Sequence, residues 1–223
     1  MRALALVGGW AHPAAQTAPA LTEAFGALGI AVECTESLDD AAARLDAGFD
    51  LFVVHACRFQ MLDARYSDDQ RAVHASRTPP AFRAAVTQYL AARRPLLGLH
   101  TAALCFDDWP TWNELLGATW DWSASSHPPP GRFQVDPTVD RIVDGVASFA
   151  VVDELYRFVQ PIVDARIVAT AVDSGGLRHP IVWRHNEGGT RVAYSALGHD
   201  HRSLSNPDHR LLLGRIVDWL VNR

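Results

Sequence analysis

Histidine is the residue in this sequence best suited to carry chemistry. The chain contains ten histidines, and imidazole is both the side chain that titrates nearest neutral pH and the commonest metal ligand. Four of them, His12, His55, His100 and His199, lie at or just beyond the ends of short apolar segments. Ligands of open α/β sheets bind beyond the carboxyl ends of the strands. If the four segments are neighbouring parallel strands, these imidazoles converge at one edge of a sheet.

His100 lies between Gly98-Leu99 and Thr101-Ala102, at a sharp turn from a strand to a helix. α/β-Hydrolases and glutamine amidotransferases place a nucleophile on such a strained elbow, close to backbone N–H groups. Histidine cannot act there as the usual thiol or hydroxyl nucleophile, so we expect a general acid or base, or a metal ligand. The alternative is a histidine that only hydrogen-bonds the neighbouring loop.

The triplet His199-Asp200-His201 offers a second reactive group. His199 with Asp200 to orient it would form a catalytic acid–base pair, and the two histidines could instead be metal ligands. Loop side chains have no fixed direction, but the convergence of the strand ends places His199 in the site, and we expect His201 as a substrate contact. A catalytic zinc site takes three protein ligands, for which His12, His100 and His199 are the candidates. No His-x-x-x-His spacing marks such a site, so we expect that no cofactor is required, with a divalent metal such as zinc as the alternative.

Two carboxylates, Asp153 and Glu154, follow the apolar segment 149–152. Adjacent residues alternate direction along a strand, so at most one of them naturally points into a shared pocket. We predict Glu154 as a catalytic group and Asp153 as a substrate contact. A solvated loop edge is the alternative.

Four tryptophans lie close together in the sequence, at Trp109, Trp112, Trp120 and Trp122. Aromatic faces stack on sugar rings and on bases, but tryptophans in a compact domain more often fill a core or an interface. We therefore favour the core or interface interpretation over ligand stacking.

The elements that must position these residues alternate between short apolar runs and helical patterns, which is typical of a parallel sheet covered by helices on both faces. The patterns predict strands at 4–7, 31–34, 51–55 and 95–99, and helices at 17–28, 39–46, 79–92 and 111–116. A strand-rich stretch at 132–195 includes a hairpin of 181–183 with 192–194, and a helix follows at 207–221. The polar stretch 56–78 is too long for an ordinary connection and is expected to cover a site or form an interface.

Composition limits the classes of protein and of partner. The 223 residues are 48% hydrophobic and 20% charged, which predicts one globular domain over 1–223. Acidic residues outnumber basic ones by 25 to 20, giving a net charge of −5; this argues against nucleic-acid or anionic-membrane partners. All 20 basic residues are arginine. The lack of lysine excludes Schiff-base, pyridoxal-phosphate and phosphate-loop lysine chemistry.

The cellular compartment is indicated by the apolar runs and the cysteines. No run approaches the roughly 18 residues of a membrane span, and the first residues lead into a strand-like segment rather than a secretion signal. Cys34, Cys57 and Cys105 are odd in number and widely spaced. Free thiols in a reducing cytoplasm are the simplest interpretation.

A set of short motifs matches one known family in order and spacing over nearly the whole chain. The motifs are 8–13 (Gly-Gly-Trp-Ala-His-Pro), 98–102 (Gly-Leu-His-Thr-Ala), 113–117 leading to His127-Pro128, 153–156 (Asp-Glu-Leu-Tyr), and 180–183 through 191–194 to 197–200. With them the sequence resembles the trehalose-utilisation, or ThuA-like, family. It departs from the family pattern at 140–145, where a His-Pro pair is usual.

The resemblance implies a three-layer α/β/α, flavodoxin-like fold of the class I glutamine amidotransferase type, with a mostly parallel central sheet. His100 then takes the place of the amidotransferase nucleophilic cysteine, so glutaminase activity is not expected. The family implies a cytoplasmic, often homo-oligomeric protein of carbohydrate utilisation. Its small-molecule substrate would be trehalose or a related disaccharide or keto-sugar.

The leading hypothesis from these residues is a hydrolase or isomerase acting on a sugar. His100 and His199 would exchange protons with a sugar hydroxyl or keto group, while Trp10, His12, His127 and Tyr156 shape the pocket. The first alternative is a non-catalytic sugar-binding or regulatory protein on the amidotransferase scaffold. The second is a metal-dependent hydrolase that uses the three candidate ligands, which a chelator would inactivate.

Overall fold

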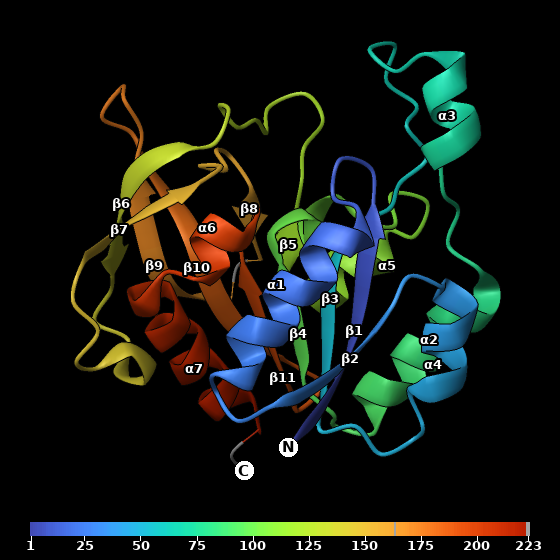
Figure 1. The fold of residues 1–223 in the computed structure, drawn as a ribbon, viewed down its shortest axis with the longest axis horizontal. Helices are drawn as coiled ribbons and strands as arrows, with labels where there is room; N and C mark the ends of the chain where they lie inside the picture. Colours follow the sequence, from blue (N-terminus) through green and yellow to red (C-terminus); the bar gives the residue numbers. More distant parts are fainter. Residues whose placement is uncertain (163, 222–223) are drawn as a thin grey trace.

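The chain is built around one large mixed β-sheet (Figure 1), seen here in a computed structural model that describes residues 1–162 and 164–221. Its strands are β1 (Arg2–Gly9), β2 (Ala31–Thr35), β3 (Leu51–Cys57), β4 (Leu96–Leu99), β6 (Gly131–Pro137), β7 (Phe149–Asp153), β9 (Arg166–Val172), β10 (Arg178–Glu187) and β11 (Thr190–Ser195). They lie in the order β2-β1-β3-β4-β11-β10-β9-β6-β7. β5 (Ala118–Thr119) and β8 (Gln160–Pro161) pair separately.

The sheet has a parallel part and an antiparallel part. All the pairs from β2 to β11 are parallel, which confirms the predicted parallel core. The predicted hairpin joins β10 to β11 in antiparallel register, and the sheet continues antiparallel through β9, β6 and β7. β3 and β4 are buried along their whole length, whereas β7 alternates between buried and half-buried residues. This difference is typical of strands covered on two faces and on one face, respectively.

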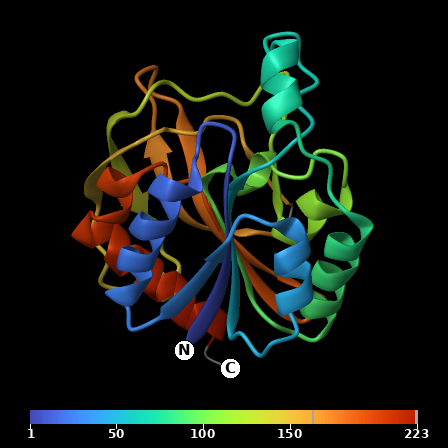
Figure 2. The ribbon, with the colours of Figure 1, turned by 45° about the vertical axis from the view of Figure 1, so that its right-hand side comes forward.

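Helices cover both faces of the sheet, as the sequence predicted (Figures 1 and 2). One layer holds α1 (Ala14–Gly26), α6 (His201–Leu204) and α7 (Pro207–Val221), and the other holds α2 (Leu38–Arg44), α4 (Pro80–Ala91) and α5 (Thr111–Leu116). The fold is therefore a three-layer α/β/α sandwich. No helix in the described part of the chain combines the length and the hydropathy that a membrane span needs.

The polar stretch predicted to be an excursion forms an arm that projects beyond the carboxyl edge of the parallel strands (Figure 1). It carries α3 (Asp68–His74), which has no buried residue. Arg71 holds the arm together by donating hydrogen bonds to the backbone carbonyls of Met61 and Asp63, at 3.0 and 3.1 Å. The ring of Trp10 contacts His74 and Tyr66 edge-on, so the arm packs against the turn that follows β1.

Candidate functional site

His100 stands at a strained turn between β4 and a 3-10 helix (His100–Leu104). Its φ of +49° lies in the left-handed region, and the elbow predicted from the sequence is thereby confirmed. Position 98 packs closely against Leu116 and requires glycine, because a Cβ at this position would lie 2.4 Å from the Leu116 side chain. The imidazole is fully buried, and its Nδ1–H donates to the Ala196 carbonyl oxygen at 2.9 Å. That bond leaves the Nε2 lone pair facing the centre of the site.

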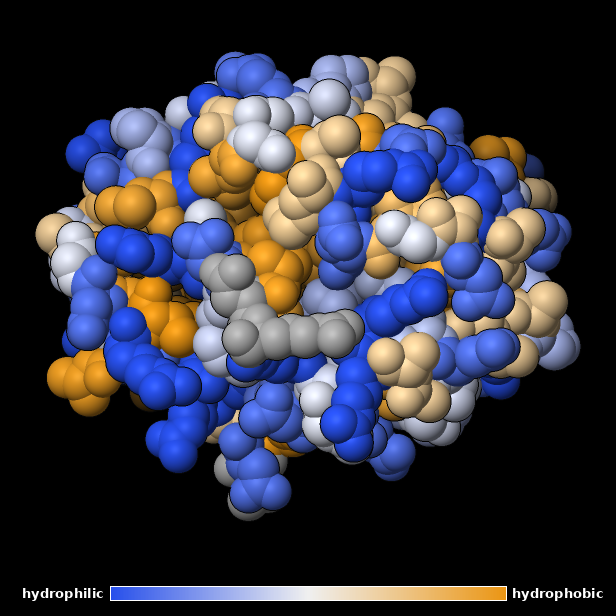
Figure 3. Space-filling view, turned by 90° about the horizontal axis from the view of Figure 1, so that it is seen from below, coloured by the Kyte–Doolittle hydropathy of each residue, from blue (hydrophilic) through white to orange (hydrophobic). Residues whose placement is uncertain are grey.

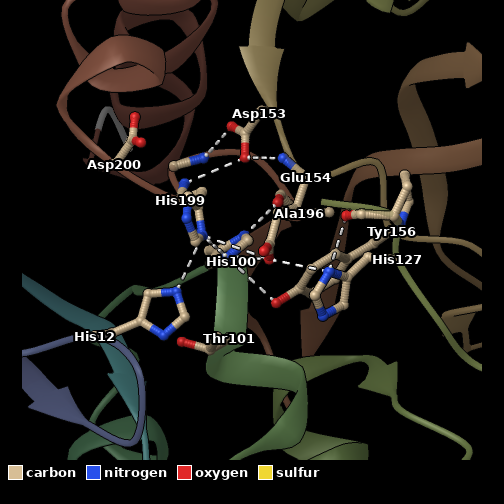
Figure 4. Close-up of polar contacts among 12 residues, drawn as sticks. His12, His100, Thr101, His127, Asp153, Glu154, Tyr156, Ala196, His199 and Asp200 are labelled. Carbon is tan, nitrogen blue, oxygen red and sulfur yellow. Dashed lines mark hydrogen bonds and ion pairs between the residues drawn. The ribbon is translucent and has the colours of Figure 1, made fainter. Parts of the chain in front are cut away.

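His12, which follows β1, and His199, which follows β11, reach the same point (Figure 4). His12 Nδ1–H donates to the Trp10 carbonyl oxygen at 3.1 Å, so its Nε2 lone pair also faces inward. His199 Nδ1 lies 3.3 Å from His12 Nε2 and 3.2 Å from His100 Nε2. One ring nitrogen of each residue lies within 4.8 Å of the other two. We call these three residues the histidine cluster.

Glu154 adds a carboxylate to the histidine cluster. Its Oε2 lies 3.3 Å from His100 Nε2, 3.4 Å from His199 Nδ1 and 3.3 Å from His127 Nδ1. Burial acts to raise the pKa of Glu154, but the polar contacts with His100 and His199 outweigh it and hold this pKa well below its usual range. The same carboxylate raises the pKa of His199 by accepting its hydrogen bond. Burial, aided by repulsion from His100, lowers the pKa of His12 to about 4.

Four of the distances in this group fit the spacing of ligand atoms in a tetrahedral metal site. Zinc–nitrogen and zinc–oxygen bonds of about 2.0–2.1 Å place the ligand atoms of a tetrahedron roughly 3.3–3.4 Å apart. Four separations among the three imidazoles and Glu154 are 3.2, 3.3, 3.3 and 3.4 Å, and one nitrogen of each imidazole lies within 4.8 Å of the other two. In metal sites the ring nitrogen that does not bind the metal usually donates to a carbonyl or carboxylate, which orients the imidazole. The Nδ1 atoms of His12 and His100 make such contacts with backbone carbonyls. The residues present therefore fit a divalent cation.

Comparison with known proteins identifies the family. The family described as ThuA, trehalose utilisation, matches residues 2–220. The chain belongs to the ThuA family. No curated protein sequence matches it significantly.

Solved structures share the fold of this ThuA chain at low sequence identity. A ThuA-like protein from Parabacteroides merdae is 17% identical, with a TM-score of 0.78 over 100% of this chain and 90% of its own. One from Bacteroides uniformis is 18% identical, with a TM-score of 0.73 and coverages of 100% and 92%. A β-galactosidase from Rahnella sp. R3 is 13% identical, with a TM-score of 0.62, and matches over 31% of its length and all of this chain. These likenesses support the α/β fold.

Two buried groups hold the turn that carries His199 in this ThuA chain. Asp153 is 1% exposed; its Oδ2 accepts the Gly198 N–H at 2.7 Å, and its Oδ1 accepts those of Glu154 and His199 at 2.7 and 3.3 Å. His55 Nε2 donates to the Gly198 carbonyl oxygen at 2.8 Å. Asp153, predicted as a substrate contact, thus lies behind Glu154 with both oxygens engaged by the backbone. No local sequence pattern signals this arrangement, because it depends on the end of β7 lying beside the turn after β11.

The structure places Asp200 and His201 away from the centre of the histidine cluster. Asp200 caps α6 by accepting the Arg202 N–H at 2.8 Å, and its carboxylate pairs with the same arginine; Figure 4 shows it turned away from His100. The His201 side chain is 64% exposed and lies 3.3 Å from Glu23. Both residues line a cavity of about 340 Å³ that His12 and His199 also line. A catalytic role for Asp200 and a substrate contact by His201, as predicted, would require the substrate to enter that cavity.

Aromatic rings cover the other side of the histidine cluster. The Tyr156 hydroxyl donates to His100 Nε2 at 3.3 Å, and its ring packs against His127, which is 36% exposed. Trp120 packs on Tyr156 and on His127, at 5.1 and 6.2 Å between ring centroids. Trp122 is half-buried beside Trp120, whereas Trp109 and Trp112 are buried in the core. The core interpretation is thus confirmed for two tryptophans, and the other two flank the site.

A cavity of about 870 Å³ lies at the opposite, amino-terminal edge of the sheet. Figure 3 shows that edge as a largely hydrophilic face with apolar residues in its middle. Arg94 donates there to the carbonyl of Leu45, the residue that caps the end of α2. Arg191 donates to the carbonyl of Trp219, which lies in the last turn of α7. Guanidinium groups at helix carboxyl ends stabilise the helices, which explains these arginines structurally.

Proposed function

We propose that the protein is a divalent-metal-dependent enzyme acting on a sugar, with the cation held by His12, His100 and His199 and assisted by Glu154. The observation that carries this proposal is the set of separations of 3.2–3.4 Å among the imidazole nitrogens and the Glu154 oxygen. Membership of a family named for trehalose utilisation supports a sugar as the substrate. A hydrolase and an isomerase both fit this arrangement.

The proposed reaction divides the work between the cation and the side chains. A bound divalent cation supplies Lewis-acid polarisation of a sugar carbonyl or hydroxyl oxygen. Glu154, ionised because its pKa is lowered, accepts a proton from the substrate. His127, whose Nδ1 lies 3.3 Å from the same carboxylate oxygen and 3.1 Å from the Pro128 carbonyl oxygen, is partly exposed and connects Glu154 with solvent. Tyr156 and Trp120 form the wall against which the sugar packs.

One observation favours a second candidate, in which His100 and His199 exchange protons with the sugar directly and no metal takes part. The hydrogen bond from Glu154 raises the pKa of His199, as would suit a general acid near neutral pH. The two candidates place different demands on the same residues. A ligand must be deprotonated at the metal, whereas the general acid must be protonated.

Cobalt(II) titration distinguishes these candidates. We expect the metal-stripped protein to bind one Co²⁺ with the visible absorption of a tetrahedral site, and we expect His100→Ala and His199→Ala to lose it. His201→Ala is the matched control, because this neighbouring imidazole is exposed and lies outside the cluster; it should bind cobalt like the wild type. Thermal unfolding with disaccharides and keto-sugars, with and without cobalt, then tests the substrate class. A sugar-dependent shift without any cobalt binding would favour the metal-free candidate.

We also propose a cytoplasmic, homo-oligomeric protein whose partner is a small sugar rather than a nucleic acid or a membrane. A protein from Salmonella typhimurium LT2 described as cytoplasmic supports the compartment, with a TM-score of 0.64 at 11% identity over all of both chains. The net charge of −5 supports the absence of polyanionic partners. Sedimentation of the purified protein tests the oligomeric state.

A further inference from the structure

A second cavity adjoins the site on the far side of the segment 127–130. It has a volume of about 440 Å³ and lies between β6, the end of β7 and the turn after β9. Pro128 and Asp153 line it, and they are the direct neighbours of His127 and Glu154. The cavity is therefore lined by residues adjacent in the chain to two that contact the histidine cluster.

Two arginines line this cavity, Arg132 and Arg157. Within residues 1–162 and 164–221, neither guanidinium has a hydrogen-bond or ion-pair partner. The Nε of Arg157 is buried without an acceptor. A buried donor without a partner is costly, and more so when it carries charge. An acceptor supplied from outside the chain would remove that cost.

The carboxylates that line the cavity are already used by other groups. Asp153 accepts three backbone N–H groups, as described above. Asp173 lies 3.0 Å from His179 Nε2 and accepts the N–H groups of Gly175 and Leu177 at 2.9 and 3.0 Å. The acceptor oxygens of both carboxylates are therefore occupied, and neither carboxylate pairs with Arg132 or Arg157.

We infer that this cavity binds the anionic group, phosphate or carboxylate, of a sugar whose reacting end extends past His127 to the histidine cluster. Guanidinium groups recognise both anions through paired, charge-assisted hydrogen bonds. The inference rests on the proposed function for the sugar and for the reacting end. The substrate is then an acidic or phosphorylated sugar rather than a neutral disaccharide.

Isothermal titration of the metal-free protein tests the anion site separately from the metal. The probes are inorganic phosphate, glucose 6-phosphate, gluconate and neutral glucose. The variants are Arg157→Gln and Arg132→Gln, of which the second alters an exposed side chain and leaves the core unchanged. Arg166→Gln is the matched control, because this exposed arginine begins the strand whose other end, Val172, lines the cavity. Each variant is also titrated with Co²⁺.

We expect glucose 6-phosphate to bind more tightly than phosphate, and glucose to bind at least tenfold more weakly than either. Each cavity variant should lose about ten- to a hundredfold in affinity for the anion, while the control variant and cobalt binding remain unchanged. Equal anion affinity in wild type and Arg132→Gln would overturn the site. Equal binding of phosphate and glucose 6-phosphate would overturn the assignment to a sugar. If the wild type binds the anion but does not bind cobalt, only the proposed metal function is refuted.

Discussion

Asp153→Asn is the substitution whose effect follows most directly from the structure. The carboxylate is buried, and one of its oxygens serves two N–H groups while the other serves the Gly198 N–H at 2.7 Å. An asparagine can place its oxygen at only one of these positions. Its NH2 group must then face a backbone N–H, so that a charge-assisted hydrogen bond is lost and two buried donors confront each other.

The magnitude follows from these contacts. A hydrogen bond to a charged group contributes about 1.5–3 kcal/mol, and an unsatisfied buried donor costs a further 1–3 kcal/mol or so. We expect the free energy of unfolding to fall by about 3 kcal/mol. In a domain of this size that corresponds to a decrease in Tm of roughly 6–12 °C. Because Asp153 also fixes the backbone of His199, cobalt affinity should fall about ten- to a hundredfold.

Urea unfolding and cobalt titration of the same variant measure both effects. The control is Asp136→Asn, because Asp136 forms a partly exposed ion pair with Arg178 at 3.0 Å and its loss should cost less than about 1 kcal/mol. If Asp153→Asn unfolds within about 0.5 kcal/mol of the wild type and binds cobalt equally well, Asp153 does not position the turn. A loss of stability with unchanged cobalt affinity would show that the turn keeps its shape without the carboxylate.

Three further predictions concern pH, charge and packing. Burial lowers the pKa of His55 to about 3, against about 6.5 in the unfolded chain, so the contribution of neutral His55 to stability is complete above pH 6.5 and is lost as the pH falls toward 3. At pH 4.5 this one group should cost about 2.7 kcal/mol, measured by urea unfolding in EDTA as the part of the wild type's acid destabilisation that His55→Gln lacks. Glu154→Gln should return the raised pKa of His199 toward 6.5, as followed by NMR titration of the metal-free protein; an unchanged value would show that another group raises it. Gly98→Ala places a Cβ 2.4 Å from a leucine side chain and should lower stability by about 1–3 kcal/mol, measured by thermal denaturation. Gly26→Ala, with open space around it, is the control and should raise stability by about 0.5–1 kcal/mol; equal effects of the two substitutions would contradict the packing argument.

Much of the fold could be predicted because its signals are local. The apolar runs 51–54 of β3 and 96–99 of β4 indicate strands covered on both faces. Gly117 ends α5 with a left-handed φ of +71°, as a glycine after a helical pattern suggests. The residue at the elbow and the histidines after the neighbouring strands could be identified for the same reason, since a strand end is visible in the sequence as the point where an apolar run stops.

The remaining features of the site depend on contacts between distant segments. Nothing near Asp153 in the sequence shows that its oxygens meet the turn at Gly198, 45 residues later. The tryptophans at 112 and 120 look alike in sequence, yet one donates to the Ala102 carbonyl in the core and the other flanks the cluster. Asp200 could be taken for a catalytic carboxylate because its role as the cap of α6 depends on where that short helix begins.

The sequence by itself determined the alternation of strands and helices, the lysine-free chemistry, and the three imidazoles at strand ends. Those properties follow from residue type and from periodicities of 2 and 3.6, which act over a few residues. Only the tertiary structure decided that β11 lies beside β4, so that His199 Nδ1 comes within 3.2 Å of His100 Nε2. It also decided that Glu154 faces the cluster while Asp153 faces the backbone. Strand order and side-chain direction depend on packing between residues far apart in the chain, which no local pattern encodes.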